Sequence, residues 1–109
     1  MKDVLIPKEL MTNEQYRNLS NDTKMIYSLI LTNFFETLIK NNMTISCDNN
    51  EKASVEVSSK ILFNSLNLSN SVFNKKLYEL VHNNLIEIEV FTDTLLKVNI
   101  VVLGKEMFC

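Results

Sequence analysis

The spacing of apolar residues changes along this chain in an order that few folds accommodate. A helical spacing of three and four residues over about 21–40 gives way to alternation over 43–57, returns over 58–83, and becomes alternation again over 85–103. A short turn, Asn67-Leu68-Ser69, divides the second helical region. Two helices joined by such a turn and followed by two strands are typical of a winged helix-turn-helix. The order therefore predicts an α+β fold whose last hairpin is the wing.

Serine residues mark where the three main helices are expected to begin. Ser20, Ser58 and Ser69 each precede an apolar pattern, and a serine side chain can accept a hydrogen bond from the first turn of a helix. Before them, residues 8–19 suit one or two brief helical turns. The third main helix should end at Asn83-Asn84, because asparagine tolerates the left-handed conformation. It is expected to bury Phe73, Leu77, Leu80 and Val81.

Two hairpins are expected around the helix-turn-helix. A central hairpin is predicted from alternation in 43–47 and 53–57, connected by 48–51. The C-terminal hairpin is predicted over 85–103, with its turn at 92–94 and with Ile86, Ile88 and Val90 on one face. We expect a single domain over 1–109, with the helix-turn-helix at about 58–83 and the wing at about 85–103.

Composition argues against catalysis and against a membrane location. Of 109 residues, 46% are hydrophobic, but no apolar run reaches the ~20 residues of a membrane span. The chain has no segment typical of a signal peptide, so we expect a cytoplasmic protein. Its one histidine, its one glycine and two distant cysteines provide no basis for a metal cluster, a phosphate-binding glycine-rich loop or a disulfide framework. We expect no metal, no cofactor and no enzymatic activity.

The third main helix carries the side chains best suited to contact double-stranded DNA. Asparagine can pair with adenine, lysine with guanine or phosphate, and hydroxyl groups with phosphate oxygens. On the face opposite the apolar residues, or at its N-terminal end, the candidate DNA-binding residues are Asn70, Ser71, Asn74, Lys75, Tyr78 and His82. The alternative interpretation of the same pattern is a solvated helix face with no partner.

The end of the first main helix is apolar on almost all sides. Phe34, Phe35, Leu38 and Ile39 lie within six residues of each other. Such a helix end either sits in the core or packs on a second copy of the chain, and we expect a homodimer. A two-fold dimer would present two recognition helices about one turn of DNA apart.

A family resemblance rests mainly on the N-terminal part of the chain. The residues that carry it are Ile6-Pro7-Lys8-Glu9-Leu10, Asn13-Glu14, Tyr16, Asn18-Leu19-Ser20-Asn21-Asp22, Lys24, Tyr27 and Leu29-Ile30-Leu31. With these residues the chain resembles the N-terminal domain of RepA-type plasmid replication initiators of Gram-positive bacteria. Weaker similarity follows at Leu66–Ser69, Lys75–Leu77, Glu79-Leu80 and Asn84–Glu87. The resemblance implies a winged helix that binds repeated origin sites in double-stranded DNA, in plasmid or phage replication.

Two departures from that family favour a second hypothesis. The family usually has an Asp-Arg pair after the position of Leu31 and a later Gly-Trp element, whereas this chain continues with Thr32-Asn33 and contains no tryptophan. The family's wing is typically basic, but the wing here sets three acidic residues against one lysine, and the net charge is −2. Because acidic groups repel phosphates, these features favour a protein-binding module on the same fold, such as a mobile-element adaptor or an inhibitor of a host or immune protein.

Overall fold

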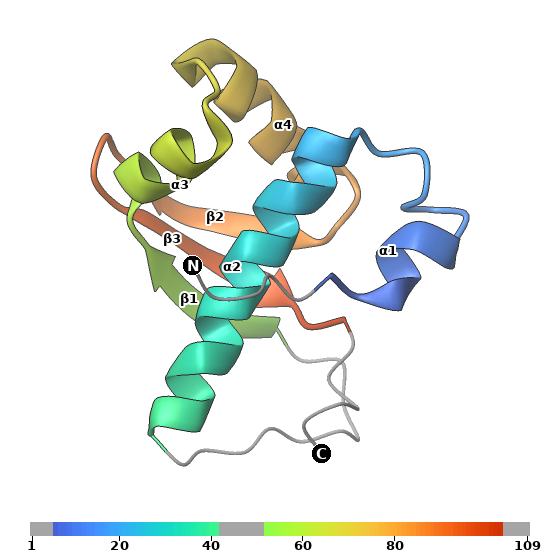
Figure 1. Ribbon diagram of the computed structural model, residues 1–109, viewed down its shortest axis with the longest axis horizontal. Helices are drawn as coiled ribbons and strands as arrows, with labels where there is room; N and C mark the ends of the chain where they lie inside the picture. Colours follow the sequence, from blue (N-terminus) through green and yellow to red (C-terminus); the bar gives the residue numbers. More distant parts are fainter. Residues whose placement is uncertain (1–5, 42–51, 104–109) are drawn as a thin grey trace.

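Helices pack beside a three-stranded antiparallel sheet in the computed structural model, which describes residues 6–41 and 52–103 (Figure 1). The elements in chain order are α1 (Lys8–Thr12), α2 (Asn21–Lys40), β1 (Lys52–Val57), α3 (Ser59–Leu66), α4 (Asn70–His82), β2 (Ile86–Phe91) and β3 (Leu96–Val101). The long helix α2 crosses the sheet, and α3 and α4 lie beside the N-terminal half of α2 (Figure 1). This is the predicted α+β winged helix-turn-helix.

The predicted serine caps are confirmed at all three main helices. Ser20 Oγ accepts from the backbone N–H of Thr23 at 3.2 Å and begins α2. Ser58 and Ser69 accept in the same way from residues 61 and 72, each at 3.3 Å, and begin α3 and α4. These bonds satisfy N–H groups that have no partner within the helix.

The turn of the helix-turn-helix is also observed where the sequence predicts it. Asn67 ends α3 in the left-handed conformation, with φ of 54°, and its N–H donates to the carbonyl of Phe63 at 2.9 Å. After α4, Asn84 adopts φ of 60° and turns the chain into β2. Asparagine accepts this conformation at a lower cost than most residues, so it takes the place that glycine often has at helix ends.

Helix α2 forms the centre of the hydrophobic core. It contacts α3, α4 and β1, and this accounts for the burial of residues around much of its circumference: Thr23, Lys24, Ile26, Tyr27, Ser28, Ile30, Leu31, Thr32, Phe35 and Leu38. The Tyr27 hydroxyl donates to the carbonyl of Val101 and accepts from the N–H of Leu103 at 3.0 Å. One α2 side chain thus fixes the end of β3, and burial raises the pKa of Tyr27.

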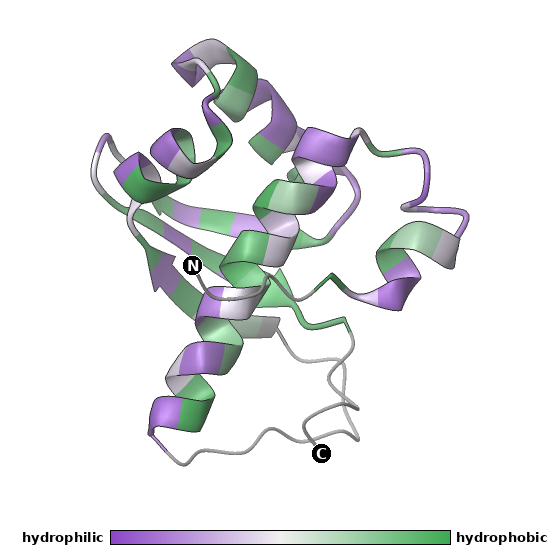
Figure 2. Cartoon of the chain, in the orientation of Figure 1, coloured by the Kyte–Doolittle hydropathy of each residue, from purple (hydrophilic) through white to green (hydrophobic). Residues whose placement is uncertain are grey.

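The wing strands follow the predicted alternation except at one position, where the prediction is wrong. In β3 the side chains of Leu96, Val98 and Ile100 are buried, and Figure 2 shows hydrophobic and hydrophilic residues alternating along β2. A bulge between Ile88 and Val90 shifts the register, so that Val90 pairs with Lys97 and Phe91 pairs with Leu96. Glu89 is the extra residue of the bulge, and its insertion turns the Val90 side chain outward, to 38% exposure. The half-buried Phe91 packs against the core instead.

Strand β1 belongs to the same sheet as the wing. It pairs antiparallel with β3, from Lys52 opposite Val101 to Val57 opposite Leu96. The predicted second arm of the central hairpin is therefore a strand, while the predicted first arm and its connection lie outside the described residues. None of the described helices is long and apolar enough to cross a membrane.

The apolar end of α2 is largely covered within one chain. Phe35 is fully buried and Leu38 is 7% exposed, whereas Phe34 is half-buried and Ile39 is 63% exposed. Of the two alternatives for this helix end, packing in the core therefore holds for Phe35 and Leu38. The dimer itself stays a prediction, which now rests on Ile39 and Phe34.

Candidate nucleic-acid interface

The outer face of α4 displays the candidate DNA-binding residues. All six are exposed: Asn70, Ser71, Asn74, Lys75, Tyr78 and His82. Four of them recur at every fourth position from 70 to 82 and form one ridge along the helix, because residues four apart are neighbours on a helix surface. Ser71 and Lys75 lie beside this ridge. The structure thus gathers the predicted residues on one continuous surface.

Aromatic packing holds the N-terminal half of α4. Phe73 is fully buried between Phe63 of α3, with ring centroids 4.5 Å apart, and Phe91 of β2, with centroids 5.9 Å apart. The first pair is edge-on, a favourable arrangement for aromatic rings. Leu77 and Leu80 continue the buried side of the helix. The exposed ridge is therefore fixed relative to both the preceding helix and the wing.

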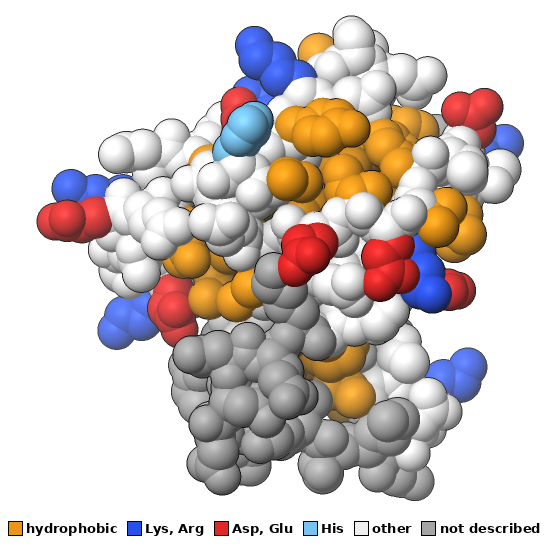
Figure 3. All heavy atoms as spheres, turned by 180° about the vertical axis from the view of Figure 1, so that it is seen from behind, with side chains coloured by type: hydrophobic (Ala, Val, Ile, Leu, Met, Phe, Trp, Pro, Cys, Tyr) orange, Lys and Arg blue, Asp and Glu red, His pale blue; other side chains and the backbone are white. Residues whose placement is uncertain are grey.

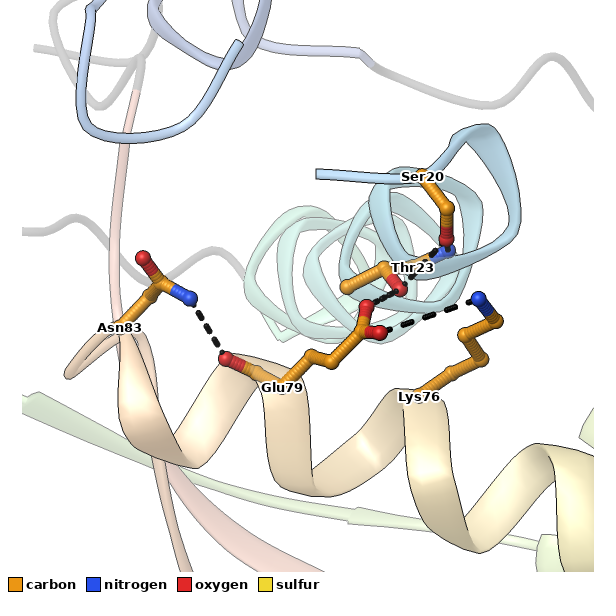
Figure 4. Close-up of polar contacts among 5 residues, drawn as sticks. All are labelled: Ser20, Thr23, Lys76, Glu79 and Asn83. Carbon is orange, nitrogen blue, oxygen red and sulfur yellow. Dashed lines mark hydrogen bonds and ion pairs between the residues drawn. The ribbon is translucent and has the colours of Figure 1, made fainter. Parts of the chain in front are cut away.

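Polar contacts hold the C-terminal half of α4 against the start of α2 (Figure 4). One carboxylate oxygen of Glu79 accepts a hydrogen bond from the Thr23 hydroxyl, and the other lies 3.8 Å from the Lys76 ammonium group. The Thr23 hydroxyl is also 2.8 Å from the hydroxyl of Ser20, which caps α2. A carboxylate at this place is stabilised by the positive end of the α2 dipole.

The final turn of α4 has a further contact with the N-terminal part of the chain. The Asn83 side chain donates to the Glu79 carbonyl at 2.8 Å, and the Gln15 side chain donates to the Asn83 carbonyl at 3.2 Å. Gln15 belongs to the segment between α1 and α2. Both ends of α4 are thus supported by other elements.

A hollow of about 220 Å³ lies between the start of α4 and the turn of the wing. Two half-buried aromatic side chains and four exposed polar or acidic ones line it: Phe63, Phe91, Asn70, Asn74, Thr92 and Asp93. The wing turn is closed by the Thr92 N–H, which donates to the Leu95 carbonyl at 2.8 Å. Sequence reasoning placed Asn70 and Asn74 at the site but missed the hollow, because its other walls come from α3 and the wing.

The acidic residues of the wing have different surroundings. Glu89 accepts a hydrogen bond from Asn99 at 2.7 Å and lies 3.5 Å from the ammonium group of Lys97, which is 3.9 Å from Glu56 as well. Asp93, in contrast, lines the hollow beside α4. On the face behind α2, described Lys and Arg side chains are dispersed among acidic and hydrophobic ones (Figure 3). Lys97 thus offsets part of the wing's negative charge, while Asp93 brings a carboxylate close to the start of α4.

Solved structures share this arrangement. The chain is 26% identical to an MDR initiator, with a TM-score of 0.60 over 94% of this chain and 78% of that one. It is structurally similar to replication initiators. The protein of a Rep–DNA complex is also 26% identical, with a TM-score of 0.56 over 91% of this chain and 73% of that one. The N-terminal domain of a DNA-binding protein, 23% identical, shares the fold with a TM-score of 0.58, covering 98% of this chain and 82% of that one.

The narrower resemblance is not confirmed by these comparisons. No protein-family model matches the chain, and no curated protein matches it. The similarity to replication initiators therefore rests on structure, and the assignment to RepA-type initiators stays a prediction.

Proposed function

We propose that this chain binds double-stranded DNA in a sequence-specific manner through α4, in the initiation of plasmid or phage replication or in its control. The ridge of α4 enters the major groove, and the residues that contact DNA are Asn70, Ser71, Asn74, Lys75, Tyr78 and His82. Two chains form a homodimer and bind origin-like repeats in the cytoplasm. The chain acts by binding and has no catalytic role.

The observation that carries this proposal is the exposed polar face of the second helix of a helix-turn-helix. Its side chains are of the types that contact base edges and phosphates, and the helix is supported at both ends, as a reading element must be. The similarity to an initiator and to the protein of a Rep–DNA complex, at 26% identity in each case, supports the same conclusion.

A second candidate function is protein binding on the same fold. The observation in its favour is electrostatic, since Asp93 lies beside the recognition helix and the net charge is −2. Such a surface attracts phosphates weakly, and an adaptor or an inhibitor of a host or immune protein would have no need of them.

Selection from a random pool of duplex DNA distinguishes the two functions. The folded protein is immobilised and incubated with the pool at moderate salt, and retained duplexes are sequenced over several rounds. DNA binding predicts enrichment of one sequence with repeated half-sites. If no duplex is retained by folded protein, DNA reading is excluded and protein binding becomes the better account.

A further inference from the structure

We propose that the hollow between α4 and the wing turn reads an A·T step in the DNA site. In this proposal the Asn74 side chain binds the major-groove edge of an adenine, and a thymine methyl group next to it enters the hollow. The inference rests on the proposed DNA binding and deepens it, because it names which chemical groups of the DNA this part of the surface recognises.

The charge of the hollow argues for a base and against a phosphate. No lysine or arginine is among the described residues that line it, and Asp93 contributes a carboxylate. A phosphate brought to this place would meet a like charge and no cation among these lining residues, which is unfavourable. Base edges are neutral, and they present hydrogen-bonding groups and, in thymine, a methyl group. The hollow therefore suits a base edge.

The chemistry of the walls favours A·T over the other base pairs. Asn70 and Asn74 stand one helical turn apart on the side facing α3 and the wing turn, and an asparagine amide can bind adenine through N6 and N7 together. Phe63 and Phe91 are half-buried aromatic walls of the same hollow, and aromatic rings make favourable contacts with the thymine methyl group. Guanine is usually read by arginine or lysine, and neither occurs in the described part of the hollow's lining.

The aromatic walls are held in place by packing that does not depend on DNA. Both contact the same buried ring, Phe73, with centroid distances of 4.5 Å from Phe63 and 5.9 Å from Phe91. Thr92 stabilises the wing turn, because its hydroxyl accepts a hydrogen bond from the N–H of Leu95 at 3.0 Å. Walls that are already in position can accept a methyl group without the cost of ordering them on binding.

Thymine-to-uracil replacement tests the inference, because it removes the C5 methyl group and leaves the base pairing intact. Each thymine of the duplex enriched by the protein is replaced singly by deoxyuridine, and the Kd is measured by fluorescence anisotropy with the full chain. We expect binding to weaken about fourfold at one step, the loss that corresponds to one buried methyl group. Replacements elsewhere should have little effect.

A second arm uses Asn74→Ala, which changes an exposed side chain and leaves the core intact. We expect this variant to bind about 5- to 150-fold more weakly, the range for one bidentate base contact, and to lose its preference for A·T at the step where uracil weakens binding. Asn18→Ala is the matched control, because this asparagine is also exposed but lies in the segment between α1 and α2, and its Kd should be unchanged.

The outcomes separate this inference from the proposed function. If the duplex is bound but uracil at every thymine leaves the Kd unchanged, the inference is overturned and DNA binding stands. The inference is likewise overturned, and DNA binding stands, if the step sensitive to uracil is remote from the step at which Asn74→Ala loses discrimination. If folded protein retains no duplex at all, the proposed function fails and the inference fails with it.

Discussion

The carboxylate of Glu79 on α4 accepts a hydrogen bond from the hydroxyl of Thr23 in the first turn of α2 (Figure 4). This contact joins the candidate recognition helix to the N-terminus of the central helix across 56 residues of sequence. Because Thr23 is fully buried, losing Glu79 would remove the charged acceptor of a polar group in the core and leave it the Ser20 hydroxyl as a partner. The position of α4 is therefore coupled to the capping of α2.

Replacing Glu79 with Ala should lower the free energy of unfolding by about 1–3 kcal/mol, since the Thr23 hydroxyl would lose a charged acceptor. Urea denaturation of Glu79→Ala, Thr23→Ala and the double variant measures the coupling. We expect the double variant to lose about 0.5–3 kcal/mol less stability than the two single losses added together. Strict additivity would show that the two residues stabilise the fold independently.

Replacing Phe73 or Leu77 with Ala should destabilise the fold by about 2–5 kcal/mol, because both side chains are fully buried and each change leaves a cavity. Val72→Ala is the control on the same helix, since Val72 is 38% exposed, and it should change stability by only about 0.5 kcal/mol. Thermal denaturation gives the comparison. Equal melting temperatures for all of these variants and the unmodified chain would be incompatible with the helix orientation.

Tyr27 should make stability depend on pH in the alkaline range. Burial raises its pKa above the ordinary value of 10.0, so the unfolded chain loses this proton first as pH rises. The free energy of unfolding should be constant with respect to this group below pH 10.0 and fall above it.

Tyr27→Phe isolates that contribution. At neutral pH it should be about 1–3 kcal/mol less stable, because the Val101 carbonyl and the Leu103 N–H lose their common partner. Urea denaturation at several pH values should show a smaller alkaline loss of stability in Tyr27→Phe than in the unmodified chain. Parallel pH profiles would mean that Tyr27 ionises alike in folded and unfolded chains.

The homodimer should depend on Ile39, the most exposed residue of the apolar end of α2. Light scattering at micromolar concentration should give the mass of two chains, and Ile39→Asp should give that of one, because a buried charge opposes association. Ile61→Asp on α3 serves as control, since Ile61 is similarly exposed at 66%, and its mass should stay that of the dimer. A single-chain mass for the unmodified protein contradicts the dimer.

The helices could be predicted from sequence because their signals are local. Each main helix begins after a capping serine, whose side chain accepts from the backbone N–H three residues ahead. Asn67 and Asn84 mark the ends of α3 and α4 because asparagine tolerates positive φ. The outward turn of Val90 could not be predicted, because a bulge depends on how β2 registers with β3. The alternation in the sequence continues through the bulge without a visible break.

The candidate site could be predicted only in part, because local spacing reveals its residues on α4 but not those that other elements contribute. Residues on α4 follow from helical spacing, and all six are exposed. The hollow required Phe63, Phe91 and Asp93 to meet across three elements, which no spacing within one segment reveals. The neutralising role of Lys97 was likewise hidden, because its partners Glu56 and Glu89 come from strands on either side of β3.

Opposite effects of two charge changes test DNA reading by α4 most directly. The Kd for the enriched duplex is measured by fluorescence anisotropy for two variants, Lys75→Ala and the double variant Glu87→Gln/Glu89→Gln. Lys40→Ala is the control, because it removes a positive charge at the far end of α2 (Figure 1). We predict that Lys75→Ala weakens binding by about 1–3 kcal/mol, that the glutamine changes strengthen it by removing repulsion of phosphates, and that Lys40→Ala has little effect. Equal losses for the two lysines, or weaker binding of the glutamine variant, would contradict the account.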